Sequence, residues 1–457
     1  MNGGDIQRVV VAGGGIVAWS AAAALKRKLP MLDVHVVSSP PPPDALADHV
    51  ANTLPSIVQF HADLGLSDED TIVRAQSAFR LGTRFREWGA GDYVHAYGSY
   101  GSGVGGVPFH QLWLREADRQ SYDAYSLGAD LGREERFAVN GTADATVGYG
   151  LQLTIDRYLD LMRAYALHIG ATERAGEIAD VEFREDGFVA AITLTDGARI
   201  HGDLFVDCAG PAATLRSRID DKRESSSRWL LCDRVRVADA RGESLLDEVV
   251  ATANGWSSAS ASASRGGEGI PIEQGRLAEP WVRNCVAIGD AAVSVEPLEW
   301  TNLHLAHSQI DRLVSMMPGK DCAPVELAEY NRQCNAEADR VRDFIIMHYV
   351  TARREEPFWK DAASVELPDS LQHSLSLFAE RGRLPYYEEE TFTRDGWLAV
   401  LFGQGFIPRR VDPLAFSIPD EQVERTLTNC RQSIAAFVAA QPSYREFVSK
   451  MGQHARA

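Results

Sequence analysis

An apolar run that ends in three consecutive glycines opens the chain and constrains its fold more than any other feature. Residues 9–12 have the pattern of a buried strand, Gly13, Gly14 and Gly15 that of a tight turn, and residues 16–25 that of an alanine-rich helix. This order predicts a βαβ nucleotide-binding unit, in which backbone amides at the helix N-terminus hold a phosphate. Ala18 stands at the third position of the G-x-G-x-x-G pattern and is small enough for close packing of the helix on the strand.

The segment after this helix departs from the usual dinucleotide-binding pattern. A second strand at 34–37 ends at Ser38, where an Asp or Glu would bind a ribose, so Ser38 is the candidate contact for that sugar. Four prolines at 40–43 predict an extended spacer, because each fixes its own φ and restricts the residue before it. The periodicity of residues 44–65 predicts one helix.

The composition excludes several classes of protein. With 457 residues, of which 45% are hydrophobic, the chain can form two or three packed domains. Its net charge of -18 argues against a nucleic-acid partner, which needs clustered Lys and Arg. We find no leader pattern and no apolar stretch of membrane-spanning length, so we expect a cytoplasmic protein without a membrane partner. The six cysteines lack C-x-x-C spacing, which predicts buried free thiols and no metal site.

Two later segments carry features of the same nucleotide-binding sheet. Residues 178–183, 188–194 and 199–206 have the pattern of strands, and after the last of them, at 207–210, we expect the chain to return to the cofactor sheet. Residues 284–288 form another predicted strand, which leads into Gly289 and Asp290. From about residue 305 onward the pattern is predominantly helical.

Together these motifs resemble the two-domain FAD-dependent monooxygenases of the glutathione-reductase-like class. More specifically, residues 78–85, 108–110 and 295–299 resemble the flavin-dependent tryptophan halogenases, and so do several C-terminal segments, among them 342–349, 357–359 and 397–405. The resemblance covers nearly the whole chain. It implies an α/β fold with a glutathione-reductase-like, Rossmann-type FAD-binding domain, an inserted substrate domain and a helical C-terminal region.

The resemblance also implies how the chain is divided. We expect a discontinuous FAD-binding domain over residues 1–90, 150–215 and 280–315. Elements of the substrate domain are expected at 91–149 and 216–279, and the helical C-terminal region at 316–457. The sequence contains no internal repeat, and no flexible linker separates these parts.

The cofactor implied by the resemblance is FAD, used as FADH2 that a separate flavin reductase supplies. The implied substrate is an aromatic or indole-bearing small molecule or peptide, and a paralogue or a second copy of the chain is a further expected partner. In the monooxygenase class the late Gly-Asp pair contacts the ribityl and pyrophosphate region of FAD. The expected cofactor contacts are Gly13, Gly14, Gly15, Val17, Ala18, Ser38, Ile178, Gly289, Asp290 and Leu303.

The reactive centre departs from the family at the residue that carries the halogenation chemistry. In family members, reduced flavin and O2 convert halide into hypohalous acid, which reaches a lysine beside the substrate; Arg80 stands at that position. A lysine amine hydrogen-bonds hypohalous acid or forms a haloamine, whereas a guanidinium is permanently protonated and a poor nucleophile. Glu299 matches the family carboxylate near the substrate, and Thr301 and Asn302 match the halide site.

Other replacements surround these positions. Trp300 stands where the family has a serine, and residues 50–55 lack the glycine and glutamate of the family's flavin strap. Two interpretations stay open for each candidate catalytic residue. Arg80 binds a substrate carboxylate or pairs with Glu87 or Glu299. Glu299 orients or deprotonates a group in the cleft, or only interacts with a helix dipole.

Three functions remain compatible with the sequence. The first is an FADH2-dependent oxidoreductase of the halogenase family, which halogenates by an atypical route or oxygenates its substrate. The second is a catalytically silent member that acts as a partner or regulator of an active paralogue. The third is an NAD(P)H-consuming aromatic hydroxylase, although no second nicotinamide-binding glycine motif is recognisable. Because of Arg80, we expect tryptophan halogenase activity to be absent or very weak.

Overall fold

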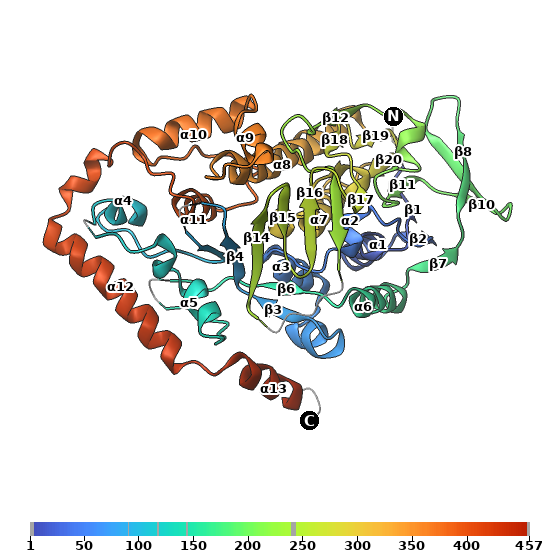
Figure 1. Cartoon of the computed structure of the whole chain (residues 1–457). Helices are drawn as coiled ribbons and strands as arrows, with labels where there is room; N and C mark the ends of the chain where they lie inside the picture. The colour runs from blue at the N-terminus through green and yellow to red at the C-terminus, as the bar shows by residue number, and fades with distance from the viewer. Residues whose placement is uncertain (1–3, 90, 117, 143–144, 239–243, 455–457) are drawn as a thin grey trace. The chain divides into compact units, whose positions relative to one another are not determined.

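The structure is a computed structural model that describes residues 4–89, 91–116, 118–142, 145–238 and 244–454. Contacts between residues divide the chain into two compact units, each made from three stretches of sequence, which the colours of Figure 1 help to locate. Unit 1 comprises Met1–Ser77, Leu153–Asp239 and Gly266–Asp339. Unit 2 comprises Ala78–Gln152, Ala240–Arg265 and Arg340–Ala457.

Unit 1 is built on a six-stranded sheet that contains, in spatial order, β19 (Trp281–Val282), β20 (Cys285–Ala287), β11 (Leu204–Asp207), β1 (Arg8–Ala12), β2 (Asp33–Ser38) and β7 (Thr172–Ala175). β1 pairs in parallel with both β2 and β11. Its three valines are fully buried, as is usual for a central strand of a parallel sheet. β20 continues the parallel pairing beside β11, and β19 closes that edge antiparallel.

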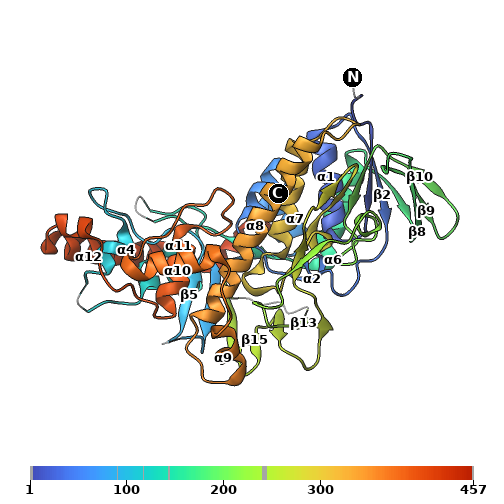
Figure 2. The same ribbon diagram turned by 90° about the horizontal axis from the view of Figure 1, so that it is seen from above.

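Helices cover one face of this sheet, and a three-stranded antiparallel sheet covers the other (Figure 2). On the helical side α1 (Ile16–Lys28) contacts α6 (Ile155–His168) and α7 (Asn302–Ser315). The second sheet contains β10 (Arg199–His201), β9 (Val189–Leu194) and β8 (Ile178–Phe183). Val10 and Phe205 of the large sheet share a buried apolar cluster with Ile192 of the small sheet, and this layer holds the two sheets together.

The other elements of unit 1 are short. Its helices are α2 (Leu46–His49), α3 (Ser56–Leu64), the π-helix η1 (Asp70–Arg74) and the 3-10 helices η3 (Arg216–Arg218), η4 (Gly289–Ala291) and η5 (Leu298–Trp300). One small antiparallel sheet contains β12 (Arg223–Ser225), β18 (Gly275–Leu277) and β21 (Val293–Ser294). β13 (Arg234–Val237) pairs with β17 (Ile270–Pro271).

Unit 2 combines strands with most of the C-terminal helices. Its strands are, in spatial order, β16 (Ala261–Ser264), β15 (Gly255–Ser257), β14 (Leu246–Thr252), β4 (Gly82–Arg86) and β5 (Tyr93–Ala96), with a separate pair of β3 (Ala78–Arg80) and β6 (Gly150–Gln152). Its helices are α4 (Phe109–Trp113), η2 (Tyr122–Tyr125), α5 (Leu127–Arg133), α9 (Pro357–Ala363), α10 (Asp369–Arg381), α11 (Arg394–Gly403), η6 (Pro413–Ser417), α12 (Asp420–Ala440) and α13 (Tyr444–His454). α8 (Pro324–Val350) begins in unit 1 and ends in unit 2.

The structure confirms the Rossmann-type α/β fold, and it refines several expectations about individual segments. The predicted strand over 199–206 divides into β10 and β11, and β11 returns to the large sheet parallel to β1, as expected. The single helix predicted over 44–65 is wrong. The chain is helical in α2 and α3 only, and Pro55 disfavours a helical conformation for Leu54 between them.

The two units also differ from the division that the resemblance implies. Residues 78–89 belong to unit 2, because β4 pairs with β14. Residues 216–238 and 266–279 belong to unit 1, where β12 pairs with β18.

All six cysteines are buried free thiols, as the sequence predicts. Among the residues that the structure describes, no helix combines the length and the apolar character that crossing a membrane requires. The same residues contain no group of three or more His, Cys, Asp or Glu placed to hold a metal ion.

Asn284 joins the two stacked sheets of unit 1 through its side chain. Its amide accepts the Val189 N–H at 2.8 Å and donates to the Val189 and Asp203 carbonyls at 2.9 and 3.1 Å. Asn284→Ala leaves these groups without partners, so we expect the thermal midpoint to fall by about 5 °C, from roughly 2 kcal/mol of lost stability. Thr195→Ala, at an exposed position after β9, should leave the midpoint unchanged. An equal fall in both variants would contradict the role of Asn284.

Candidate functional site

Three loops meet at the C-terminal edge of the large sheet of unit 1. Gly13 follows β1, has a φ of 131° and donates its N–H to the Val37 carbonyl at 3.0 Å. A Cβ at this position would lie 2.6 Å from the Cys208 carbonyl oxygen, so only glycine fits between β2 and the segment after β11. The parallel register thus brings the turns after β1, β2 and β11 together, which is the arrangement of a dinucleotide-binding sheet.

The N-terminus of α1 binds an acidic side chain, that of Asp48. Its Oδ1 accepts the Val17 N–H at 2.9 Å, and the residue is 3% exposed. A Cβ on Gly15 would lie 2.3 Å from the Asp48 carboxyl carbon, so the carboxyl group fills the space that the glycine leaves open. Burial raises the pKa of Asp48 to about 7, although hydrogen bonds from the Val17 and Ile16 amides oppose that rise.

This contact tests whether the turn fits a flavin pyrophosphate. The amides expected to hold a phosphate do bind an acidic oxygen, so the donor set suits an anion. The oxygen that they bind belongs to the chain itself. Sequence analysis missed Asp48, because its place depends on where α2 packs rather than on a local pattern.

Asp290, an expected flavin contact, bonds to the same segment as Asp48. Its Oδ2 accepts the Ala47 N–H at 2.7 Å, and the preceding Gly289 donates its N–H to Gln309 Oε1 at 2.7 Å. Burial raises the pKa of Asp290 well above its usual range, and the nearby Asp48 carboxyl raises it further. One short segment, α2, therefore contacts both motifs that the sequence assigns to the flavin.

The expected ribose position carries an acid that sequence analysis missed. Ser38 Oγ donates to Glu173 Oε1 at 2.8 Å, across 135 residues of sequence. Glu173 also accepts Arg163 Nε at 3.1 Å, and hydrogen bonding from Arg163 lowers its pKa. The pairing of β7 with β2 brings Glu173 to this place. No local signal identifies it, because dinucleotide-binding patterns place the acid at the end of β2 itself.

The remaining expected cofactor residues lie at different depths in unit 1. Ala18 is fully buried, and a Cβ on Gly13 would come 3.3 Å from its side chain. A Cβ on Gly14 would lie 2.4 Å from the Ser39 carbonyl oxygen. Leu303 is buried in the first turn of α7. Ile178 is partly buried and packs against the apolar cluster between the two sheets.

An unusual backbone conformation distinguishes the turn that carries Glu299. Glu299 and Trp300 have φ values of 64° and 60°, and this left-handed conformation costs about 1 kcal/mol or more for each non-glycine residue. Both residues are buried. Such strain occurs most often at functional sites, where surrounding structure maintains it.

The next two residues are the expected halide-binding pair. Asn302 donates from Nδ2 to the Val295 carbonyl at 2.8 Å. Within the described parts of the chain, Thr301 Oγ1 and Asn302 Oδ1 are buried without a hydrogen-bond partner. The Thr301 hydroxyl is a donor that a small anion can accept.

Arg80 belongs to unit 2, where it lies in a buried polar cluster. It is 3% exposed, donates from Nη1 to the Phe79 carbonyl at 2.9 Å, and donates from Nη2 to Gln152 Oε1. Burial raises the pKa of the nearby Asp247 to about 7, and the positive charge of Arg80 opposes that rise.

Glu87, one of the expected partners of Arg80, pairs with Arg354 at 3.5 Å. Asp247 escaped sequence analysis because the pairing of β14 with β4 brings it close.

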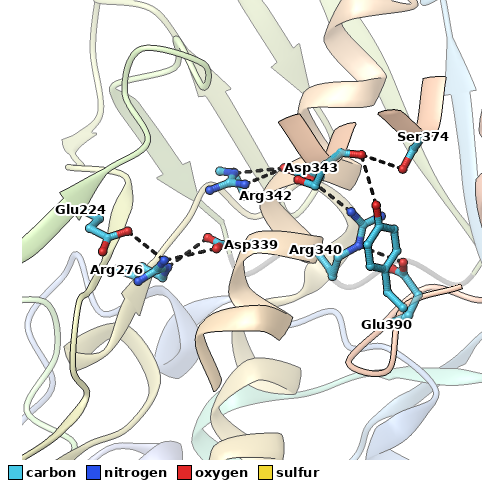
Figure 3. Close-up of polar contacts among 10 residues, drawn as sticks. Glu224, Arg276, Asp339, Arg340, Arg342, Asp343, Ser374 and Glu390 are labelled. Atoms are coloured by element: carbon cyan, nitrogen blue, oxygen red, sulfur yellow. Dashed lines mark hydrogen bonds and ion pairs between the residues drawn. The ribbon is translucent and has the colours of Figure 1, made fainter. Parts of the chain in front are cut away.

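A cavity of about 210 Å³ lies among the C-terminal elements of unit 2. Its lining includes four aromatic residues and a charged pair: Tyr386, Tyr387, Phe392, Trp397, Arg340 and Glu390. Arg340 lies 3.9 Å from the centre of the Tyr387 ring and bonds to Asp343 and Glu390, each at 3.1 Å (Figure 3). Aromatic walls with a few polar groups suit a flat ring that carries a polar substituent.

The protonation of Asp48 makes the stability of unit 1 depend on pH. Folded Asp48 keeps its proton up to about pH 7, whereas in the unfolded chain it loses it near pH 4, so stability falls as the pH rises between these values. Between pH 5 and pH 8 the Asp48 contribution to this loss is about 3 kcal/mol in wild type, and this contribution should be absent in Asp48→Asn. Thermal midpoints at pH 5 and pH 8 measure it. Asp63→Asn, at a partly exposed ion pair with Lys28, should follow wild type; identical slopes in wild type and Asp48→Asn would contradict this account.

Comparisons with known proteins identify halogenases as similar to this chain over nearly its full length. A sequence profile described as tryptophan halogenase matches residues 8–259 and 257–420. The tryptophan 6-halogenase SttH of Streptomyces toxytricini is 25% identical over 99% of this chain and 100% of its own length. The structure of BrvH, a flavin-dependent halogenase from Brevundimonas sp. BAL3, is 32% identical with a TM-score of 0.90, over 98% of this chain and 99% of that one. Xcc4156, a flavin-dependent halogenase from Xanthomonas campestris, is 30% identical with a TM-score of 0.89, over 98% of both chains.

The match of sequence and fold over nearly the full length agrees with the nucleotide-binding geometry of unit 1. The chain therefore belongs to the tryptophan halogenase family of flavin-dependent proteins.

Proposed function

We propose that this chain is an FADH2-dependent oxidoreductase that acts on an aromatic or indole-bearing substrate and does not halogenate tryptophan by the family's lysine route. Flavin-dependent halogenases of this family work with FADH2 from a separate flavin reductase. We also propose that a separate flavin reductase supplies FADH2 to this chain and that both proteins act in the cytoplasm. The observation that carries the proposal is the environment of Arg80.

Arg80 lacks both properties that the lysine route needs. A guanidinium keeps its proton and does not form a haloamine. In addition, its two terminal nitrogens already donate to the Phe79 carbonyl and Gln152, and its charge faces the buried Asp247. We therefore assign Arg80 a positioning role, in which it holds the β3–β6 pair and compensates the charge of Asp247.

The residues of unit 1 supply the proposed flavin site. When bound, reduced flavin provides the activation of O2. The Ile16 and Val17 amides would hold the pyrophosphate, and Ser38 with Glu173 would hold the ribose. The Thr301 hydroxyl is the proposed donor to a small anion. Glu299, on its strained turn, is the proposed group that orients the substrate or takes a proton from it.

Tryptophan is the first substrate to test. With FAD, a flavin reductase, NADH and chloride or bromide, we expect mass spectrometry to find no halotryptophan, or only traces. Robust chlorotryptophan or bromotryptophan would overturn the assignment of Arg80. Arg80→Lys restores an amine that can bind hypohalous acid, and a gain of activity in this variant would show that the rest of the reactive centre is competent.

We propose the aromatic cavity of unit 2, which Glu299 does not line, as a site that binds an aromatic part of the substrate other than the reacting group. A screen of indoles and indole-bearing peptides, read by mass spectrometry for added oxygen or halogen, identifies the substrate. For that substrate, Tyr387→Leu should raise KM about 3- to 10-fold, because one aromatic contact contributes about 1 kcal/mol. Phe416→Leu, at an aromatic residue that is 65% exposed, is the matched control and should leave KM unchanged. Equal KM values in all three proteins would remove the cavity from the proposal.

A catalytically silent protein that binds or regulates an active paralogue is the second candidate. The observation that favours it is the Asp48 side chain at the N-terminus of α1, where flavin phosphate would bind. Titration of the protein with FAD, followed by flavin absorbance and tryptophan quenching, separates the two candidates. Micromolar binding supports the enzyme, and no binding at millimolar flavin supports the silent protein.

A further inference from the structure

The contact between Asp48 and α1 resembles the contact of a phosphate with a helix N-terminus. The positive end of the helix dipole and the free amides of the first turn attract negative oxygens, whatever group carries them. Asp48 places a carboxyl oxygen 2.9 Å from the Val17 amide nitrogen, in the gap left by Gly15. This side chain and a flavin pyrophosphate cannot occupy that gap together.

The backbone of the same segment is held at the second flavin motif. Asp290 Oδ2 accepts the Ala47 N–H at 2.7 Å, and Ala47 immediately precedes Asp48. Two adjacent residues of α2 thus engage both the glycine turn after β1 and the Gly289–Ala291 turn after β20. We call residues 44–50 the plug segment.

We propose that the plug segment is a built-in competitor for flavin: Asp48 occupies the pyrophosphate position in the flavin-free protein, and flavin binds only when the segment withdraws. This inference rests on the proposed flavin-dependent function and describes its regulation. The apparent affinity for flavin is then the intrinsic affinity multiplied by the fraction of protein in which the plug segment is withdrawn.

Displacement of the plug segment is linked to pH. Asp48 takes part in a group of acids that includes Asp290, Asp44 and the Cys208 thiol, and burial is the main cause of its raised pKa. Buried Asp48 has a pKa of about 7, and once in solvent it has the ordinary value for an aspartate, so withdrawal releases a proton. The equilibrium that keeps the plug segment in place against withdrawal therefore falls by about 10-fold as the pH rises from 6 to 8.

Calorimetric titration of the full chain with FAD and with inorganic pyrophosphate tests the proposal. Asp48→Ala removes the competitor and should bind both ligands at least about 10-fold more tightly than wild type at pH 6. The ratio of the affinity of Asp48→Ala to that of wild type should be about 10-fold smaller at pH 8 than at pH 6. Asp63→Ala changes an acid on α3, outside the plug segment, and should behave as wild type.

Asp48→Asn guards against misfolding of the alanine variant. Its amide oxygen still accepts the Val17 N–H, but it carries no titrating proton. The ratio of the wild-type Kd to the Asp48→Asn Kd should therefore fall between pH 6 and pH 8. A constant ratio, equal affinities of wild type and a folded Asp48→Ala variant, or failure of both Asp48 variants to bind either ligand would each overturn the proposed role of the plug segment.

The outcomes also separate this inference from the proposed function. Tighter binding of pyrophosphate and FAD to Asp48→Ala, with no flavin-dependent product from any aromatic substrate, would support the plug and reject the oxidoreductase. Equal flavin binding by wild type and Asp48→Ala, together with product formation, would reject the plug and support the oxidoreductase.

Discussion

The parallel pairing of β1 with β2 on one side and β11 on the other is the constraint on which the rest of unit 1 depends. Parallel strands leave the sheet at the same edge, so three turns from distant parts of the sequence meet there. Gly13 makes that meeting sterically possible, because any side chain would collide with the Cys208 carbonyl. The orientation of α1, and with it the direction of its free amides, follows from this junction.

Those amides need a negative partner, and the structure meets the need internally. Burying an acidic side chain is costly, and the raised pKa of Asp48 expresses that cost. The same pKa means that Asp48 is only partly ionised near neutral pH. A pyrophosphate carries more charge and more acceptor oxygens, and is the stronger partner for a helix N-terminus. The fold thus places the Asp48 carboxyl group, a weaker partner, at the helix N-terminus where we propose that a flavin phosphate binds.

In unit 2, Arg80 lies in a buried polar cluster, at the position that the resemblance matches to the family's reactive lysine. Arg80 has more donors than a lysine, and they bind the Phe79 carbonyl and Gln152. Its charge also offsets the burial of Asp247. A side chain held in this way stabilises its neighbours, and this is the basis of the proposal that Arg80 does not react with a diffusing oxidant.

The sequence by itself determined the nucleotide-binding unit, the return of the chain at β11, the second motif at Gly289 and Asp290, and the family. These are properties of short segments, in which strand, tight turn and helix follow one another with recognisable residues. Only the tertiary structure decided which acids surround the candidate sites. Asp48 reaches Val17 across 31 residues, and Glu173 reaches Ser38 across 135. Strand register and helix packing set such contacts, and a local pattern holds no information about which distant side chain will fill a given space.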